Sequence, residues 1–419
     1  CGMRLAGTSS PASPMNPAEL ASFLKSRVRT VRDWPKPRVN FRDVTTLLGD
    51  PEAFRAAVRA LAVTARLLGA VRIAAVDARG SRCAPSVNFP RVNDRAMSLT
   101  IWTNAKFSDA DTRLLLEGTR GHQLIFSTQS SASVLTAGSP DPDLPRADIA
   151  LGQPDVAQCL ASSRLRWVEV TTAGYTRYDT PEFREAFQRR GAAFTNASDV
   201  FADPCAQHVL AMMLAFGRRL PESHRDQLGD HAWHYFERRY HSRLLTGQTV
   251  VLLGFGAIGR RLAELLAPFR MNVIAVRRQT RSERGVRIIP EEAISSALAE
   301  ADHVVNILPD NAATLNYVNA RRIACFKPGA RFYNVGRGTT VDENALLEGL
   351  RSGRIGEAYL DVFATEPLPP THPLWTAPHC YITPHTAGGR HDQDTAIVRH
   401  FLANLTAFLA GQPMVDRIV

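Results

Sequence analysis

The chain has 419 residues, of which 45% are hydrophobic and 21% charged, a composition typical of a soluble globular protein with two or three domains. Its formal net charge is +10, but the basic residues are mostly arginines scattered along the chain, so we expect no nucleic-acid partner. Apolar runs such as residues 209–216 are too short to cross a membrane, and no secretory signal is visible. The 6 cysteines are widely spaced, which indicates a reducing cytoplasm and gives no metal-binding pattern.

The first 96 residues differ in character from the rest. Residues 1–19 are rich in Ser, Pro, Ala and Gly, and we expect them to be disordered. Residues 20–80 contain the runs PKP, NFRD, DPEAF and DARG, in an order that resembles the N-terminal third of adenine phosphoribosyltransferase. The later phosphoribosyl-binding loop of that family is missing. We therefore interpret residues 20–80, with an expected helix at 51–68, as a remnant or fusion artefact without transferase activity.

Residues 81–96 are predicted to be a linker, which makes Met97 a candidate start of the natural protein. Strands and helices then alternate, and this predicts a small doubly wound α/β domain. The expected strands cover residues 97–102, 123–126, 147–151 and 167–170, and the expected helix covers 109–116. We place this flavodoxin-like substrate domain at residues 97–203 and complete it with 386–419. The apolar segment at 204–219 predicts an interdomain helix.

A glycine-rich turn follows the expected strand at residues 249–253. Gly254, Gly256 and Gly259 have the G-x-G-x-x-G spacing, and residues 257–266 carry apolar side chains at helical spacing. In this context the glycines permit a tight turn, close approach of a pyrophosphate and close packing of helix on strand. The helix N-terminus also favours phosphate. We therefore assign dinucleotide contacts to Gly254, Gly256, Ala257, Ile258 and Gly259.

The next expected strand, at residues 272–276, ends in Arg277 and Arg278. Dinucleotide-binding folds usually place an Asp or Glu there, which holds the ribose 2′-hydroxyl of NAD. A guanidinium pairs with a 2′-phosphate instead, so the sequence favours NADP over NAD. The alternative interpretation is that these arginines only cover a surface edge.

The αβ alternation continues, which predicts a Rossmann-type dinucleotide-binding domain at residues 204–385. Its further expected helices cover residues 290–300 and 342–352, and its further strands cover 303–308, 330–335 and 358–362. A helical pattern at residues 390–410 is expected to return to the substrate domain. Two domains joined by two helices leave a cleft between them.

Three late motifs each follow a predicted strand, and each supplies one group that hydride transfer to a 2-keto acid requires. The motif N-V-G-R-G at residues 334–338 contains Arg337. Its guanidinium can bind a carboxylate through two hydrogen bonds and can polarise the adjacent carbonyl. L-D-V-F-A-T-E-P presents Asp361 and Glu366, and I-T-P-H-T-A-G presents His385. A carboxylate paired with His385 would stabilise the imidazolium, which can protonate a new alkoxide.

Together with the glycine motif, these three motifs resemble the D-isomer-specific 2-hydroxyacid dehydrogenase family over residues 97–419. The resemblance implies that Arg337 binds substrate, that Glu366 pairs with the histidine and that His385 moves the proton. It places Asp361 near the nicotinamide amide. It also implies a homodimer.

Two weaker motifs agree with the same family. Residues 171–175, T-T-A-G-Y, resemble its substrate-carboxylate loop, and residues 308–309 resemble a loop that covers the adenosine. We therefore assign substrate contacts to Ala173, Gly174, Tyr175 and Arg337, and further cofactor contacts to Leu308 and Pro309. Gln207 replaces a common Glu, and we interpret the neighbouring His208 as structural.

The sequence thus predicts a cytoplasmic oxidoreductase that transfers a hydride between NADP(H) or NAD(H) and a small 2-keto or D-2-hydroxy acid of the glyoxylate, hydroxypyruvate or pyruvate type. Formate dehydrogenase is disfavoured, because that branch carries Gln at the position of Glu366. Two other interpretations stay open at this point: a cofactor-sensing binding protein of the same fold, and a protein related to adenine phosphoribosyltransferase.

Overall fold

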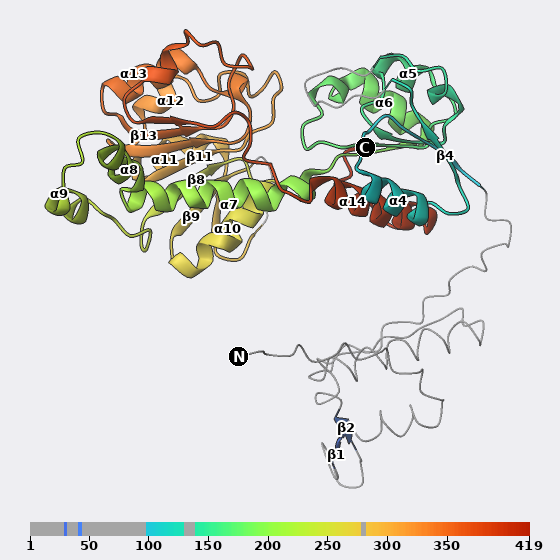
Figure 1. Ribbon diagram of the computed structural model, residues 1–419, viewed down its shortest axis with the longest axis horizontal. Coiled ribbons are helices and arrows are strands. Elements are labelled where there is room, and N and C mark those ends of the chain that lie inside the picture. The colour runs from blue at the N-terminus through green and yellow to red at the C-terminus, as the bar shows by residue number, and fades with distance from the viewer. Residues whose placement is uncertain (1–28, 32–40, 44–97, 130–138, 278–281) are drawn as a thin grey trace, which may run out of the picture. The chain divides into compact units, whose positions relative to one another are not determined.

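A computed structural model describes residues 29–31, 41–43, 98–129, 139–277 and 282–419 (Figure 1). The chain divides into two compact units, Cys1–Ala96 and Met97–Val419. In the first unit, strands β1 (Arg29–Val31) and β2 (Phe41–Asp43) pair antiparallel. The helix expected at residues 51–68, the linker and most of the phosphoribosyltransferase-like segment lie outside the described residues.

The larger sheet of the second unit has 7 strands in the order β10-β9-β8-β11-β12-β13-β14, all of them parallel. The strands are β8 (Thr249–Leu253), β9 (Asn272–Val276), β10 (Val286–Ile289), β11 (His303–Asn306), β12 (Ala330–Asn334), β13 (Ile355–Leu360) and β14 (Cys380–Ile382). In chain order this is 3-2-1-4-5-6-7, the doubly wound Rossmann arrangement, whose strand order reverses between β8 and β11. The predicted Rossmann-type fold is confirmed.

Helices cover both faces of this sheet because its central strands carry apolar side chains on both faces. Alternate residues of β8 belong to two separate cores: Val251 and Leu253 to one, Val250 and Leu252 to the other. The first core is closed by α11 (Ile294–Glu300), α12 (Ala320–Ala324) and α13 (Glu343–Arg351). The second is closed by α7 (Ser198–Gly217) and α10 (Ala257–Leu266). Two-sided burial therefore fixes β8 at the centre of the domain.

The smaller sheet has 5 parallel strands in the order β4-β3-β5-β6-β7, which is the flavodoxin order 2-1-3-4-5. Its strands are β3 (Thr100–Thr103), β4 (Gln123–Phe126), β5 (Ile149–Gly152), β6 (Trp167–Val170) and β7 (Ala193–Thr195). Helices α4 (Asp109–Gly118) and α14 (Gln393–Leu409) cover one face, while α5 (Val156–Ala161) and α6 (Pro181–Arg190) cover the other (Figure 1). The predicted flavodoxin-like fold is confirmed.

The last helix belongs to the smaller sheet although the larger sheet precedes it in the chain. Trp167 of β6 stacks on Phe401 of α14 at 5.1 Å between ring centroids. His400 of α14 lies between Glu169 and Asp416, at 3.1 Å and 3.2 Å. Burial would lower the pKa of His400, but bonding to these two carboxylates raises it to about 10. A charged imidazolium therefore fastens the C-terminal tail to this domain.

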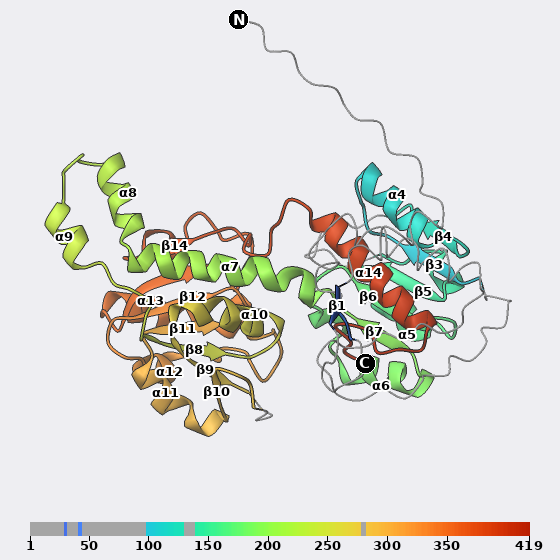
Figure 2. The same cartoon turned by 90° about the horizontal axis from the view of Figure 1, so that it is seen from below.

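Helix α7 connects the two sheets (Figure 2). It begins at Ser198, six residues before the predicted start at Pro204, so the prediction was wrong there. A proline usually marks a helix start because it lacks the N–H that an interior position would donate, but packing of α7 on α10 continues the helix through Pro204. The proposed boundary between residues 203 and 204 falls inside this helix, and the domain limits stay a prediction.

Within the described residues, α7 is the one helix with the length and mean hydropathy, 1.3, of a membrane span. Of its 18-residue window, 44% is buried in the structure. Core helices of soluble proteins pass the same test, so α7 alone does not indicate a membrane protein.

Several further elements complete the unit. Helices α8 (Leu220–Leu228) and α9 (Tyr235–Tyr240) form an arm beyond α7 (Figure 1). Short 3₁₀ segments lie at Leu144–Arg146, Thr176–Tyr178, Ala267–Phe269, Glu291–Ala293, Gly338–Thr340 and Pro373–Thr376.

Candidate active site

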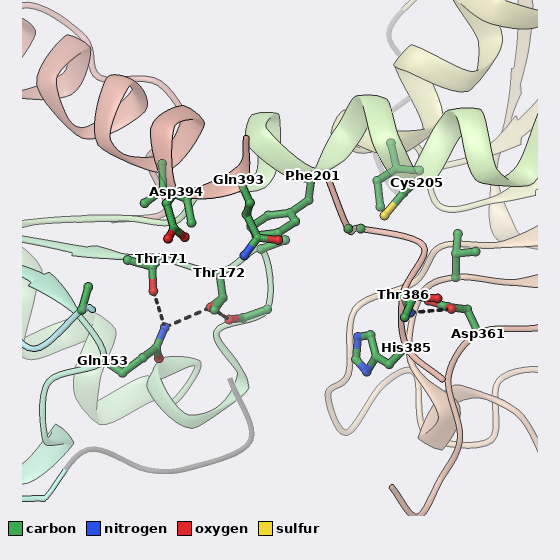
Figure 3. A pocket seen from close by; sticks show the side chains of 18 of the residues that line it. Gln153, Thr171, Thr172, Phe201, Cys205, Asp361, His385, Thr386, Gln393 and Asp394 are labelled. Carbon is green, nitrogen blue, oxygen red and sulfur yellow. Dashed lines mark hydrogen bonds between the residues drawn. The ribbon is translucent and has the colours of Figure 1, made fainter. Parts of the chain in front are cut away.

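The carboxyl ends of β8, β12, β13 and β14 meet at one edge of the larger sheet, because all of these strands are parallel. This edge carries the glycine turn, Arg337, Asp361 and His385. A cavity of about 390 Å³ opens there and is lined from both domains (Figure 3). The predicted substrate loop and the three predicted catalytic strand ends therefore surround one continuous region.

Glu366 and His385 form a close pair. The Nδ1 atom of His385 lies 2.7 Å from Oε2 of Glu366, and the other carboxylate oxygen accepts the N–H of Phe363 at 2.9 Å. Burial alone would raise the pKa of Glu366, but the hydrogen bonds from His385 and Phe363 hold it below its ordinary value. Glu366 is therefore a carboxylate at neutral pH, and it leaves Nε2 of His385 available to a substrate.

The carboxylate of Asp361, which is 2% exposed, fixes the turn that carries His385. One oxygen accepts the hydroxyl of Thr383 at 2.5 Å and the N–H of Thr386 at 2.8 Å, and the other accepts the N–H of Ala387 at 2.9 Å. His385 sits within this turn at φ 55°, a left-handed conformation that most side chains avoid. Asp361 also lines the cavity. Its position near the nicotinamide, which the sequence predicted, stays a proposal.

Arg337 lines the same cavity as His385. A buried polar network positions its backbone: Asn306 bonds to Asn334 at 2.9 Å and to Thr340 at 2.6 Å, and the Thr340 hydroxyl donates to the Arg337 carbonyl at 2.6 Å. Burial lowers the pKa of the guanidinium from its ordinary value, while the Glu366 charge acts in the opposite direction. Arg337 remains a cation, held in a poorly hydrated place where an anion would be bound strongly.

The loop at residues 171–175 faces Arg337 from the smaller domain. A methyl group added at Gly174 would lie 2.0 Å from Nη2 of Arg337, so the guanidinium would have to move to admit a larger residue there. The Thr172 hydroxyl donates to the Gly174 carbonyl at 2.6 Å, and Asn196 donates to the Ala173 carbonyl at 2.7 Å. Ala173 lines the 390 Å³ cavity, while Tyr175 lines an adjoining cavity of about 280 Å³ together with Glu366 and His385.

The glycine turn lines a further cavity of about 300 Å³, which the substrate loop also borders. Gly254 has φ +95°, Gly256 precedes the first turn of α10, and an added methyl at Gly259 would lie 3.0 Å from Ile307. A methyl added at Gly256 would instead point into open space, which suits an approaching pyrophosphate. Ala257 and Ile258 begin α10 and line the same cavity. These residues fit the phosphates of a dinucleotide.

The glycine turn also borders a cavity of about 780 Å³ at the end of β9. Leu308 and Pro309 line both this cavity and the previous one. Arg277 lines the larger one, with Nη1 3.7 Å from Glu283, a loose ion pair. Arg278 lies outside the described residues.

Sequence reasoning missed Gln153, a residue in the wall of the site. Gln153, which follows β5, is 5% exposed and donates to Thr172 at 3.3 Å and Thr171 at 3.4 Å in the cavity wall. Its place at the carboxyl end of a parallel strand was a usable signal. His208 stacks on Tyr359 at 5.4 Å, a packing contact that agrees with the structural interpretation.

Comparisons with known proteins agree with this geometry. The pattern of the family described as "D-isomer specific 2-hydroxyacid dehydrogenase, NAD binding domain" matches residues 210–387. The glyoxylate reductase of Pyrococcus furiosus is 30% identical over 259 residues, which cover 59% of this chain and 74% of that protein. The "uncharacterized protein in proB 3'region" of Corynebacterium melassecola is 30% identical over 324 residues, 73% of this chain and 94% of its own.

This chain belongs to the D-isomer-specific 2-hydroxyacid dehydrogenase family. A solved structure agrees: the family member from Xanthobacter autotrophicus Py2, in complex with NADPH and MES, is 28% identical, has a TM-score of 0.64, and covers 77% of this chain and 98% of its own.

As a member of this dehydrogenase family the chain is an oxidoreductase that uses NADP or NAD, as the sequence predicted. The sequence-based assignment of residues 20–80 stays a prediction.

The close contact of Gly174 with Arg337 gives a test of the site. In Gly174→Ala the new methyl displaces the guanidinium, so the KM for a 2-keto acid should rise about tenfold or more while the Kd of the cofactor stays close to that of the wild type. Steady-state kinetics and fluorescence titration measure the two constants. Gly191→Ala is the control, because it strains a positive-φ helix cap without touching the cavity. An equal KM in Gly174→Ala and wild type would contradict the proposed carboxylate site.

Proposed function

We propose that the dehydrogenase reduces a small 2-keto acid of the glyoxylate, hydroxypyruvate or pyruvate type to the D-2-hydroxy acid, with NADPH preferred as the reductant. The observation that supports this most is the Glu366–His385 pair, which borders the same cavity as Arg337. A proton donor and an anion-binding cation thus face one space beside a dinucleotide-binding turn.

The reaction follows from these positions. The carboxylate of the substrate lies between Arg337 and the Gly174 loop, which leaves its carbonyl oxygen toward His385. When bound, the nicotinamide supplies the hydride to the carbonyl carbon. Nε2 of His385 gives its proton to the oxygen as negative charge develops there, and Glu366 stabilises the imidazolium before that transfer. Arg337 stabilises the developing alkoxide.

Closure of the two domains is part of the proposal. The cavity is lined from both domains, which are connected by α7 and by the segment between β14 and α14. Narrowing the cleft over the substrate would exclude water, which strengthens the contacts of Arg337 and His385 with the reacting atoms.

Substitution of the proton donor tests the mechanism. His385→Ala should lower kcat for glyoxylate reduction by about a hundredfold or more, because general acid catalysis contributes about 10²–10⁴-fold. The Kd of NADPH should change little, since the side chain faces the substrate. His208→Ala is the matched control and should keep most of its turnover. Wild-type kcat in His385→Ala would rule out this proton donor.

The preference for NADPH rests on Arg277, which lines the cavity beyond the glycine turn and forms only a loose ion pair, with Glu283. A 2′-phosphate would replace the distant Glu283 with a charge-assisted bidentate contact. The relative from Xanthobacter autotrophicus Py2, whose solved structure is a complex with NADPH, supports the same cofactor.

In Arg277→Ser the ratio of kcat/KM for NADPH to that for NADH should fall about tenfold, because the phosphate loses its partner. The rate of cofactor oxidation at 340 nm, measured against cofactor concentration, gives this ratio. Arg284→Ser removes a nearby exposed arginine that does not line the cavity and should leave the ratio as it is. An unchanged ratio in Arg277→Ser would show that this arginine does not bind the 2′-phosphate of NADPH.

We further propose that the enzyme is a homodimer that associates through the α8–α9 arm. Large apolar side chains are exposed along this arm: Leu220, Leu228, Trp233, Tyr235, Phe236, Tyr240 and Leu244. Such a group of exposed aromatics is typical of an interface. The base of the arm is held by Arg219, which bonds to Glu222 and Glu357 at 2.9 Å each, so the apolar side chains are presented on a fixed support.

Trp233, which is 91% exposed, is the most direct probe of the arm. Trp233→Glu places a charge in the proposed interface and should convert a dimer into a monomer at micromolar protein concentration. Light scattering after gel filtration measures the mass. Trp375→Glu, at an exposed tryptophan outside the arm, should stay dimeric. A monomeric wild type, or a dimeric Trp233→Glu, would contradict the interface.

We place the enzyme in a reducing cytoplasm. The cysteines of the described residues, Cys159, Cys205, Cys325 and Cys380, are all free. Burial raises the pKa of Cys205 to about 12, so this thiol in the cavity wall stays protonated and unreactive.

A further inference from the structure

The substrate cavity has an acidic wall away from the catalytic strand ends. Asp394, in the first turn of α14, lines the same cavity as Arg337 and His385. Figure 3 shows its carboxylate on the side of Thr171 and Gln153, across the cavity from His385. A 2-keto acid bound by Arg337 and His385 would therefore extend its side chain toward this wall.

The carboxylate of Asp394 is half-buried. Among the residues that the structure describes, no donor or cation contacts it. Burial, and then the nearby charge of Asp111 on α4, raise the pKa of Asp394, as expected for a carboxylate without a counter-ion. The hydroxyls of Thr395 and Ser108 donate to Asp111 and not to Asp394.

The position of Asp394 in the helix explains only part of this arrangement. A carboxylate in the first turn of a 17-residue helix is favourable to the helix dipole. The dipole accounts for an acidic residue at this position, but not for its facing the substrate cavity without a cation from the described part of the chain.

Lys106 is the other charged residue of the smaller domain that lines this cavity. Its side chain is exposed, so the ammonium is already hydrated. Lys106 and Asp394 form no ion pair, which means that the ammonium nitrogen lies more than 4.0 Å from the carboxylate oxygens. A half-buried unpaired carboxylate gains more from a ligand of opposite charge than an exposed ammonium does.

We propose that Asp394 is a specificity-determining residue that selects 2-keto acids whose side chain ends in a positively charged group. This inference rests on the proposed function, since it needs the keto-acid group to be held by Arg337 and His385. Acidic side chains are disfavoured at this wall, because they would place two carboxylates together.

The test uses two isosteric substrates that cannot cyclise. One is 2-oxo-5-(trimethylammonio)pentanoate, and the other is its neutral carbon analogue, 6,6-dimethyl-2-oxoheptanoate. The measured quantity is the ratio of kcat/KM for the cationic to that for the neutral substrate, with NADPH. The wild-type ratio should be about fivefold or more. In Asp394→Asn, which keeps the size of the side chain, the ratio should fall to about one.

Asp109→Asn is the matched control, because Asp109 is an acidic first-turn residue of α4 that does not line the cavity, and it should keep the wild-type ratio. Thermal unfolding and the Kd of NADPH show whether Asp394→Asn is folded. If Asp394→Asn does not fold, Asp394→Glu should retain the preference for the cationic substrate, and loss of it would overturn the proposal.

Two failures are distinguishable. No turnover of glyoxylate, hydroxypyruvate, pyruvate or either probe by the wild type would overturn the proposed function and this inference with it. Normal turnover of one of these acids, together with a ratio of about one in the wild type or an unchanged ratio in Asp394→Asn, would overturn the role of Asp394 alone. A preference for 2-oxoglutarate over both probes would also overturn it and would point to Lys106.

Discussion

The buried carboxylate of Asp361 is the constraint on which the candidate site depends. It accepts three hydrogen bonds from Thr383, Thr386 and Ala387, and so it ties the end of β13 to the turn after β14. Within that turn His385 adopts a left-handed backbone conformation, which would be unfavourable without these bonds. The conformation brings its ring to Glu366, so one buried group sets the geometry of the proposed proton donor.

The electrostatics of the cavity follow from how each charge is held. Glu366 is kept ionised by two hydrogen bonds, and Arg337 is a cation in a poorly hydrated place. These two charges stabilise the two ends of a reaction in which a carbonyl becomes an alkoxide and then an alcohol. Asp394, on the opposite wall, has no such partner among the described residues. On the catalytic side of the cavity the protein itself supplies charges of both signs. On the opposite side, in the proposal made above, a cationic group of the substrate supplies the counter-ion of Asp394.

Local signals account for what the sequence could predict. Strand β8 and helix α10 have the predicted bounds. A strand with apolar side chains on both faces and a glycine-rich turn can each be recognised from fewer than about 20 consecutive residues. Strand β10, a short element at the outer edge of the sheet, carried no such pattern. The 17-residue helix α14 was predicted, yet nothing local showed that Asp394 would share a cavity with Arg337. That juxtaposition depends on two domains whose cavity-lining segments are far apart in the sequence.

The most direct test of the proposed reductase is NADPH-dependent reduction of glyoxylate, hydroxypyruvate and pyruvate by the purified full-length chain, with chiral analysis of the products. We expect NADPH oxidation with at least one of these acids. Pyruvate or hydroxypyruvate, where it reacts, should give the D-2-hydroxy acid, because the carboxylate at Arg337 and the proton donor His385 fix which face of the carbonyl meets the nicotinamide. Formation of the L-isomer, or absence of oxidation with all three acids although NADPH binds, would contradict the proposed function.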